Sequence, residues 1–405
     1  MATTTPLRWD ARQWALLFVL AGNMLIDALE VSIVLPALPS IAGDLGLTIG
    51  GVHWLMSGFA AGFAAVLLAG PALTARWGRR RLYLLALFVF AAVSVAGGLT
   101  GSIAVLIATR VLKGACAALT APTGLAIIGR TFSGADARGR AISVYSLFGA
   151  AGFTVGLLLS GVLTLASWRW VLMFTAPVAL LLVAFAARLL PVDAAGSVAA
   201  PRPGRRLLTH RPLWRAATGA GLLNGTYLGL LLVTTFAVQE RLGWRPWQAA
   251  LACLPACLPL AVSSSLSGRL VARFGPARLI ALGALAAAAG YALRFASPVP
   301  DSYVLGILPT LLLVGAAFVL SFAALNARAL DGVEDGDRPV AVAMYQFAVQ
   351  CGAVLVLWLV ATLRANFGTD RPALFVLALG GALAFAVAVT GIPLSRRFRP
   401  EVRPS

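Results

Sequence analysis

The strongest constraint on the fold is a series of long apolar segments, separated by short strips that are rich in arginine. A helix needs about 20 apolar residues to cross the roughly 30 Å hydrocarbon core of a bilayer. The chain is 60% hydrophobic and only 11% charged, whereas soluble proteins are about 25% charged. The sequence therefore predicts an all-α integral membrane protein with twelve transmembrane helices. The expected spans lie near residues 14–36, 52–73, 82–99, 102–128, 141–165, 169–190, 213–237, 247–268, 277–297, 302–326, 339–362 and 372–393.

The basic residues are distributed unevenly between the two sides of these spans. Of the 32 lysines and arginines, 24 fall in the N-terminus, the even-numbered loops and the C-terminal tail, and six fall on the other side. Because cytoplasmic loops carry the excess of basic residues, we expect a multi-pass protein of the cell membrane with both termini in the cytoplasm. The same placement makes the lipid bilayer, not nucleic acid, the expected partner of the net charge of +18.

An internal repeat divides the chain into two similar parts. The segments "PALTARWGRRRLYLL" (71–85) and "GRLVARFGPARLIAL" (268–282) match at a constant offset of 197 residues, and each follows the second span of its part. Such a repeat is typical of duplicated secondary transporters. We expect a six-helix bundle at 1–190, a cytoplasmic linker at 191–212 and a second six-helix bundle at 213–405. Gly78 and Gly275 are expected to permit a tight reversal or a close backbone approach in the two matching turns.

Several motifs resemble those of the major facilitator superfamily, and more closely its drug:proton antiporter branch. "LEVSIVLPALPSIAGDL" resembles the first-helix signature, with Glu30 in place of the signature Asp. "ARWGRRR" resembles the loop after the second helix, "IATRVLKGACAAL" the fourth-helix motif, and "GAAGFTVGLLLSGVL" the fifth-helix antiporter motif. The resemblance implies two pseudo-symmetric six-helix bundles that work by alternating access. The residues it implies for the conformational switch are Arg76, Gly78, Arg79, Arg80, Gly152, Gly156, Arg273 and Gly275.

The chain also departs from the family pattern at these motifs. The loop motif has Ala75 where the family has an Asp, and the second copy has Ala272. Gly152 is followed by Phe153 instead of a proline, and Lys113 replaces the fourth-helix Gln. The glycines of the fifth span are still expected to allow close helix packing.

Four ionisable residues are expected deep in the membrane. Asp27 and Glu30 share one helix face, as do Arg110 and Lys113, because each pair is three residues apart. Buried charges are costly unless they are paired, and by default they indicate function. Counting about 1.5 Å per residue makes Asp27 and Arg110 the most level pair, with Glu30 as the alternative partner of Arg110.

The functional interpretation of these charges is proton coupling. Burial and a nearby cation have opposite effects on a carboxyl group, and a moving transporter can change both. We expect Glu30 to carry the proton, with Asp27 second, Arg110 as modulator, and Lys113 offsetting the second acid or binding an anionic substrate group. The alternative is a static double ion pair between two helices. Two acids and two bases sum to zero, which favours neutral or mixed substrates over obligate cations.

The second half offers polar and aromatic side chains for substrate binding. The candidates are Asn224, Tyr227, Tyr345, Gln346 and Gln350. Each of them taken alone is also compatible with a hydrogen bond between helices.

The function expected from the sequence is proton-coupled export of small, partly hydrophobic molecules. The alternatives are a facilitator or importer of the same fold, and a non-transporting membrane sensor. We expect no enzymatic activity, cofactor or metal, because the sequence has no Ser–His pairing, metal cluster or phosphate loop. The expected partners are a small-molecule substrate and protons, and we expect a monomer.

Overall fold

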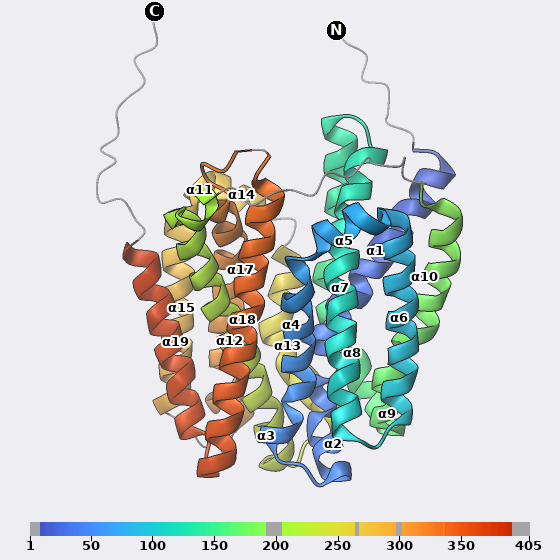
Figure 1. The fold of residues 1–405 in the computed structure, drawn as a ribbon. Helices are drawn as coiled ribbons and strands as arrows, with labels where there is room; N and C mark the ends of the chain where they lie inside the picture. Colours follow the sequence, from blue (N-terminus) through green and yellow to red (C-terminus); the bar gives the residue numbers. More distant parts are fainter. Residues whose placement is uncertain (1–8, 192–204, 264–266, 297–301, 335, 391–405) are drawn as a thin grey trace, which may run out of the picture.

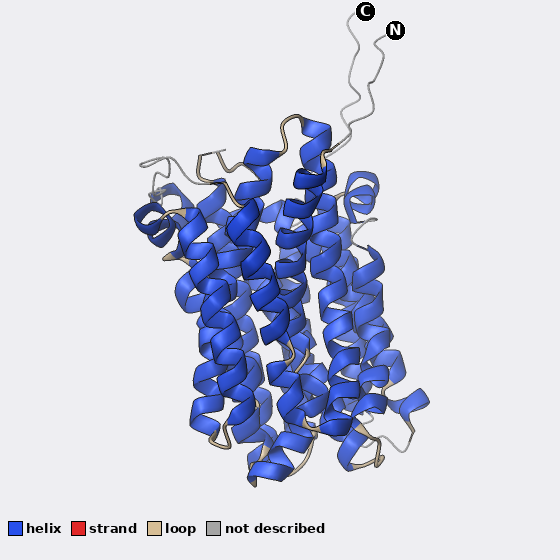
Figure 2. Cartoon of the chain, turned by 90° about the vertical axis from the view of Figure 1, so that its right-hand side faces the viewer, coloured by secondary structure: helices blue, strands red, loops and turns tan. Residues whose placement is uncertain are grey.

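The computed structural model describes residues 9–191, 205–263, 267–296, 302–334 and 336–390. Within these residues the chain is helical and forms no strand (Figure 2). Eleven helical segments in this part are long and apolar enough to cross a membrane. The eighth expected span, 247–268, corresponds to α13 (Pro246–Ser263) and adjoins residues 264–266, which lie outside the described part. The fold class expected from the sequence, an all-α membrane protein of twelve helices, is confirmed.

The first half is built from the helices that correspond to the first six expected spans. Asp10 caps α1 with a reciprocal capping box, in which the Asp10 side chain accepts from the Gln13 backbone and the Gln13 side chain accepts from the Asp10 backbone. The elements are α1 (Ala11–Ser32), the 3-10 turn η1 (Leu35–Ala37), α2 (Leu38–Leu45), α3 (Ile49–Val52), α4 (Trp54–Leu67), α5 (Gly70–Trp77), α6 (Arg79–Leu99), α7 (Ile103–Thr131), α8 (Ala135–Ala166), α9 (Trp168–Met173) and α10 (Thr175–Leu189). The first expected span was too short at its far end, because the helical segment continues through η1 and α2 to Leu45.

The second half repeats this order. Its elements are α11 (Arg205–Leu208), α12 (Arg211–Glu240), α13, α14 (Ser267–Phe274), α15 (Pro276–Ala296), α16 (Tyr303–Gly306), α17 (Leu308–Ala329), α18 (Arg338–Phe367) and α19 (Arg371–Thr390). The tenth expected span, 302–326, is realised as α16 and α17. Figure 1 shows the two halves side by side, the first in blue to green and the second in yellow-green to red.

Helix packing follows the same scheme in both halves. In the first half, α1 packs on α8, α4 on α7, and α6 on α10. In the second half the corresponding pairs are α12 with α18, α13 with α17, and α15 with α19. Both α6 and α15 have 21 residues and begin 197 residues apart, at Arg79 and Pro276. The packing therefore follows the duplication expected from the sequence. The boundaries 1–190, 191–212 and 213–405 stay a prediction, since 192–204 lies outside the described residues.

The molecule has two distinct ends (Figure 1). One end, where α1 begins and α5 and α14 lie, is called the arginine-rich end here, after residues such as Arg76 and Arg273. The opposite end holds α2, α3 and α9. At the opposite end the halves touch: Gln239 Nε2 donates to Pro36 O at 3.0 Å, and a Cβ on Gly161 would lie 2.7 Å from Trp247 Cα. The structure is therefore closed at the opposite end.

Candidate functional site

Glycines on α8 bring that helix against the segment of α1 that carries the two acids. A Cβ on Gly152 would lie 2.5 Å from Leu25 O, and one on Gly156 would lie 2.7 Å from Leu29 O. Ser32 Oγ also donates to Phe153 O at 2.7 Å. The close packing expected for these glycines is confirmed. Since the contacts are with backbone atoms, a shift of α8 must move α1 as well.

Glu30 is the centre of a buried charge network. Its carboxylate pairs with Arg110 through Oε2, and with Lys113 through Oε1 at 2.7 Å. The Thr175 hydroxyl donates to Oε1 at 2.8 Å, and Arg110 Nη2 donates to the Glu30 carbonyl at 2.6 Å. Arg110 Nε also donates to Leu55 O at 2.7 Å, which ties the network to α4. Side-chain exposure of Glu30, Arg110 and Lys113 is 1% or less, so the ions are held inside the first half.

Asp27 has different partners from those expected. Its Oδ2 accepts from Asn23 Nδ2 and from Thr120 Oγ1, each at 3.0 Å. The expectation that Asp27 and Arg110 form the most level pair was wrong, and the alternative partner Glu30 pairs with Arg110 instead. The depth count failed because it took the first span to end near 36, whereas the helical segment runs to Leu45. The two acids therefore occupy separate environments, one ionic and one neutral.

Aromatic rings cover the two cations of the network. The Arg110 guanidinium lies 5.0 Å from the Phe59 ring centroid, and Lys113 Nζ lies 5.2 Å from that of Phe90. Phe59 also lines a cavity between the halves, described next. One aromatic ring therefore stands between Arg110 and this cavity.

The central cavity has a volume of about 150 Å³ and is lined by residues from both halves. None of the described residues that line it is charged. They are Val31, Met56, Phe59, Ala60, Phe153, Asn224, Tyr227, Leu228, Phe318, Phe322, Gln346, Val349 and Gln350. The wall is thus aromatic and aliphatic with three side-chain amides, a composition that suits a partly hydrophobic small molecule.

Four of the five expected substrate-binding residues line this cavity: Asn224, Tyr227, Gln346 and Gln350. Tyr345 does not. It is fully buried, and its ring centroid lies 6.4 Å from that of Phe322. Two of the lining residues also connect helices, because Asn224 Nδ2 donates to Val349 O at 3.4 Å and the Tyr227 hydroxyl contacts Cys257 Sγ at 3.2 Å. The structure therefore combines the two alternatives that the sequence left open for these residues.

The expected switch residues of the repeated loops lie at the arginine-rich end. Gly78 has a φ of 80° and Gly275 a φ of 76°, so both turns use the left-handed backbone that favours glycine. Arg76 and Arg273 occupy the last turns of α5 and α14, and Arg79 begins α6. Arg80 donates to the carbonyl of Ala187 in α10. The tight reversal expected at the two glycines is confirmed, whereas the switch role of these residues stays a prediction.

A second ionic cluster, which the sequence analysis missed, lies at the opposite end of the second half. Arg364 pairs with Glu240 at 2.6 Å and with Asp370 at 2.9 Å, and Arg241 reaches Asp370 at 3.4 Å. Arg241 and Arg364 are two of the six basic residues that fall on the side away from the expected cytoplasmic loops. The available signal was the presence of Glu240 and Asp370 at neighbouring helix ends, beside arginines on the same side of the membrane.

Comparison with known proteins places the chain in a family. A model of the Major Facilitator Superfamily matches residues 20–357. The puromycin resistance protein pur8 of Streptomyces alboniger is 30% identical, over 95% of this chain and 89% of its own length. The lincomycin resistance protein of Streptomyces lincolnensis is 26% identical, over 95% and 92%. The cephamycin export protein CmcT of Amycolatopsis lactamdurans is 34% identical, over 56% and 49%. By the extent of these matches and by its fold, the chain belongs to the major facilitator superfamily.

Proposed function

We propose that this protein exports small, partly hydrophobic molecules across the cell membrane in exchange for protons. The observation that carries the proposal is an uncharged cavity shared by both halves, with a buried charge network directly behind its wall. The names of the relatives, which refer to puromycin and lincomycin resistance and to cephamycin export, support a cargo of this kind. The arginine-rich end is the cytoplasmic one, because basic residues concentrate on the cytoplasmic side.

The proton site in this proposal is Asp27. A proton on Glu30 would leave Arg110 and Lys113 buried without their counter-ion, which is costly. A proton on Asp27 breaks no ion pair, because its partners Asn23 and Thr120 are neutral. It also fits the hydrogen bonds of Thr120, whose hydroxyl lies 3.2 Å from Cys116 O and can donate there while accepting from Asp27. This reverses the order expected from the sequence, which put Glu30 first.

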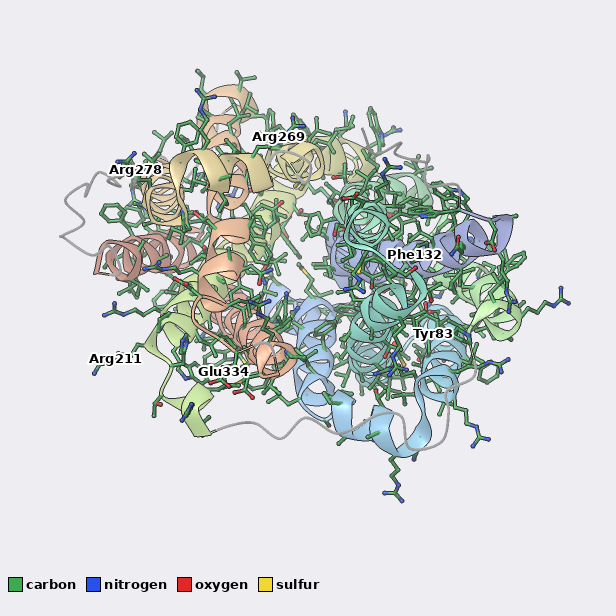
Figure 3. All side chains as sticks on the ribbon, turned by 90° about the horizontal axis from the view of Figure 1, so that it is seen from above. Tyr83, Phe132, Arg211, Arg269, Arg278 and Glu334 are labelled. Carbon is green, nitrogen blue, oxygen red and sulfur yellow. The ribbon has the colours of Figure 1, made fainter. Side chains whose placement is uncertain are left out.

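A polar route supports proton exchange between Asp27 and the cytoplasmic end. Tyr83 lies in the second turn of α6 and is fully buried. The Tyr83 hydroxyl and Asn23 Oδ1 are buried without a hydrogen-bond partner in the described part of the chain. Buried polar atoms of this kind are commonly satisfied by water, and water next to an acid supplies a path for a proton. Tyr83 is visible from the arginine-rich end in Figure 3.

Coupling between proton and cargo runs through α1. Val31 lines the cavity, and it directly follows Glu30 in the helix that also carries Asp27. Cargo that enters from the cytoplasm while the opposite end is closed contacts Val31. The resulting shift of α1, together with α8, relative to Thr120 of α7 releases the proton from Asp27. Opening of the opposite end then breaks the contact between Gln239 and Pro36. In this scheme proton and cargo occupy the transporter in alternate steps, and a single chain is sufficient.

Transport by the purified protein in lipid vesicles tests the proposal, with puromycin as the first probe. We expect an inward-directed proton gradient to drive puromycin efflux in the wild type. Asp27→Asn should still exchange puromycin down its own gradient but should lose the response to the proton gradient. Asp44→Asn is the matched control, because that acid lies at the end of α2 and pairs with the partly exposed Arg169. Gradient-independent flux in the wild type would favour a facilitator instead.

A further inference from the structure

A second cavity lies inside the second half, at the arginine-rich end. It has a volume of about 110 Å³ and is enclosed by α12, α15, α17 and α19. Its inner wall is apolar and includes Leu223, Ile280, Ala284, Leu325 and Ala384. It shares no lining residue with the central cavity. The proposed transport cycle therefore leaves this cavity without a role.

Comparison of the two halves explains why this cavity exists. At the offset of 197 residues, Tyr83, Leu87 and Phe90 of α6 correspond to Ile280, Ala284 and Ala287 of α15. In the first half these three side chains are 2% exposed or less and fill the core. In the second half two of the three positions carry alanine. The smaller side chains leave space between the same four helix positions.

Arginines stand at the mouth of the cavity. Arg211 and Arg215 lie one turn apart at the start of α12, and Arg328 lies in the last turn of α17. Arg328 also pairs with Asp331 at 3.1 Å. Figure 3 shows Arg211 at the arginine-rich end of the second half. Three arginines thus line the cavity at the level where the headgroups of the cytoplasmic leaflet lie.

A buried polar atom also points to a ligand. Ser321 lines the cavity and is 2% exposed, and its hydroxyl has no hydrogen-bond partner among the described residues. An unsatisfied buried hydroxyl requires an explanation, for example a partner absent from the chain itself. The Ser321 oxygen lies beside Gly283 of α15, 2.0 Å from the place that a Cβ on that glycine would take, at the edge of the cavity.

We infer that this cavity binds one acyl chain of an anionic phospholipid from the cytoplasmic leaflet, with the lipid phosphate against Arg211, Arg215 and Arg328. The dimensions agree, since residues 211–223 of α12 rise about 18 Å and half of the hydrocarbon core is about 15 Å. Guanidinium groups bind phosphate through paired N–H donors. Inorganic phosphate alone lacks the apolar part that the inner wall requires.

Native mass spectrometry of the full-length protein tests this inference. The protein is purified in detergent and incubated with phosphatidylglycerol or with phosphatidylcholine. We expect the wild type to retain one more phosphatidylglycerol than Ala284→Phe, which fills the cavity. Ala289→Phe is the matched control, because it makes the same change on the exposed face of α15. Equal retention of phosphatidylglycerol by Ala284→Phe and Ala289→Phe would overturn the inference.

Variants that remove charge provide a second test, which does not depend on whether Ala284→Phe folds. The double variant Arg211→Gln/Arg215→Gln should weaken phosphatidylglycerol binding about tenfold or more, in line with the loss of charged hydrogen bonds. Arg278→Gln, an exposed arginine of α15 that does not line the cavity, should bind as the wild type does. Binding that is insensitive to the double variant, or equally strong for phosphatidylcholine, would contradict the site. Displacement by free oleate but not by phosphatidylglycerol would assign the cavity to a fatty acid instead and would also overturn the inference.

Discussion

The two halves place charge differently at the same positions of their first helix. At the offset of 197 residues, Asp27 and Glu30 of α1 correspond to Asn224 and Tyr227 of α12. The two acids lie inside the first half with their hydrogen-bonding and ionic partners. Asn224 and Tyr227 are neutral and line the central cavity. In the proposed function, the duplicated fold thus separates two tasks: the first half holds the titrating groups, and the second half supplies neutral residues to the cavity wall.

At the opposite end of the molecule the distribution of ion pairs is reversed. The second half has its ionic cluster at the opposite end, where Arg364 joins Glu240 and Asp370. Its core at the arginine-rich end contains a cavity instead of the large side chains that fill the first half. The first half has a partly exposed pair at its own opposite end, between Asp44 and Arg169. Similar helix packing therefore allows different distributions of charge and volume.

The largest difference in stability between the halves is expected for substitutions at the matching positions Glu30 and Tyr227. Glu30→Gln leaves two buried cations without their counter-ion, so we expect it to lower the free energy of unfolding by about 3–5 kcal/mol. Tyr227→Phe removes a neutral hydrogen bond and should cost about 1 kcal/mol. Thermal unfolding in detergent checks both. The double variant Glu30→Gln/Lys113→Met also removes one of the unpaired cations and should recover part of the lost stability. Equal losses for Glu30→Gln and Tyr227→Phe would show that the Glu30 network does not contribute more to stability than a neutral hydrogen bond.

The contact between the first and fifth helix of each half should be equally sensitive to added volume. Gly152→Ala places a Cβ 2.5 Å from Leu25 O, and Gly221→Ala places one 2.8 Å from Ala348 O. We expect each to cost about 1–3 kcal/mol, since the neighbouring atoms are backbone. Gly129→Ala, with open space around the new Cβ, is the control and should be neutral or stabilising. The comparison fails if Gly152→Ala unfolds at the wild-type temperature.

A smaller effect is expected when an acid is moved into the neutral cavity. Asn224→Asp gives position 224 of the second half the same residue type as the corresponding position 27 of the first half. The new carboxylate should raise affinity for a lipophilic cation such as ethidium about tenfold, the scale of one charged hydrogen bond. Fluorescence titration of the purified protein measures this, with Gln350→Ala as a neutral control in the same wall. Unchanged ethidium affinity would place position 224 outside the region that cargo contacts.

The smallest effect concerns the exposed ends. Asp44→Asn removes a partly exposed ion pair with Arg169 at 3.3 Å, and exposed pairs of this kind contribute little. We expect no measurable change in unfolding temperature or in proton-driven transport. A marked loss of either would show that the opposite end of the first half also takes part in the proton cycle.

The sequence predicts the fold well because the length of each apolar run decides whether it can span the bilayer. The twelve spans, the duplication and the left-handed turns at Gly78 and Gly275 all follow from local patterns. The candidate site was predicted only in part. Which acid meets Arg110 depends on where the helical segment made of α1, η1 and α2 ends. Its continuation through Pro36 to Leu45 cannot be predicted from hydropathy alone.

Two further features escaped prediction because they depend on packing between distant segments. Tyr345 has the same chemistry as Tyr227, yet rotation of α18 puts it in the core while Gln346 and Gln350 line the cavity. The pairing of Arg364 with Glu240 joins residues 124 apart in the chain. Neither the direction of a side chain nor a contact over that separation is encoded in a local pattern.

Proton release on cargo binding tests the separation of tasks most directly. Puromycin is added to the purified protein in weakly buffered detergent solution, and a pH-indicator dye reports protons released. The account predicts release of a proton by the wild type and by Asp44→Asn, and no release by Asp27→Asn, which should still bind puromycin. Release of the same amount by Asp27→Asn and the wild type would contradict the assignment of the proton to Asp27.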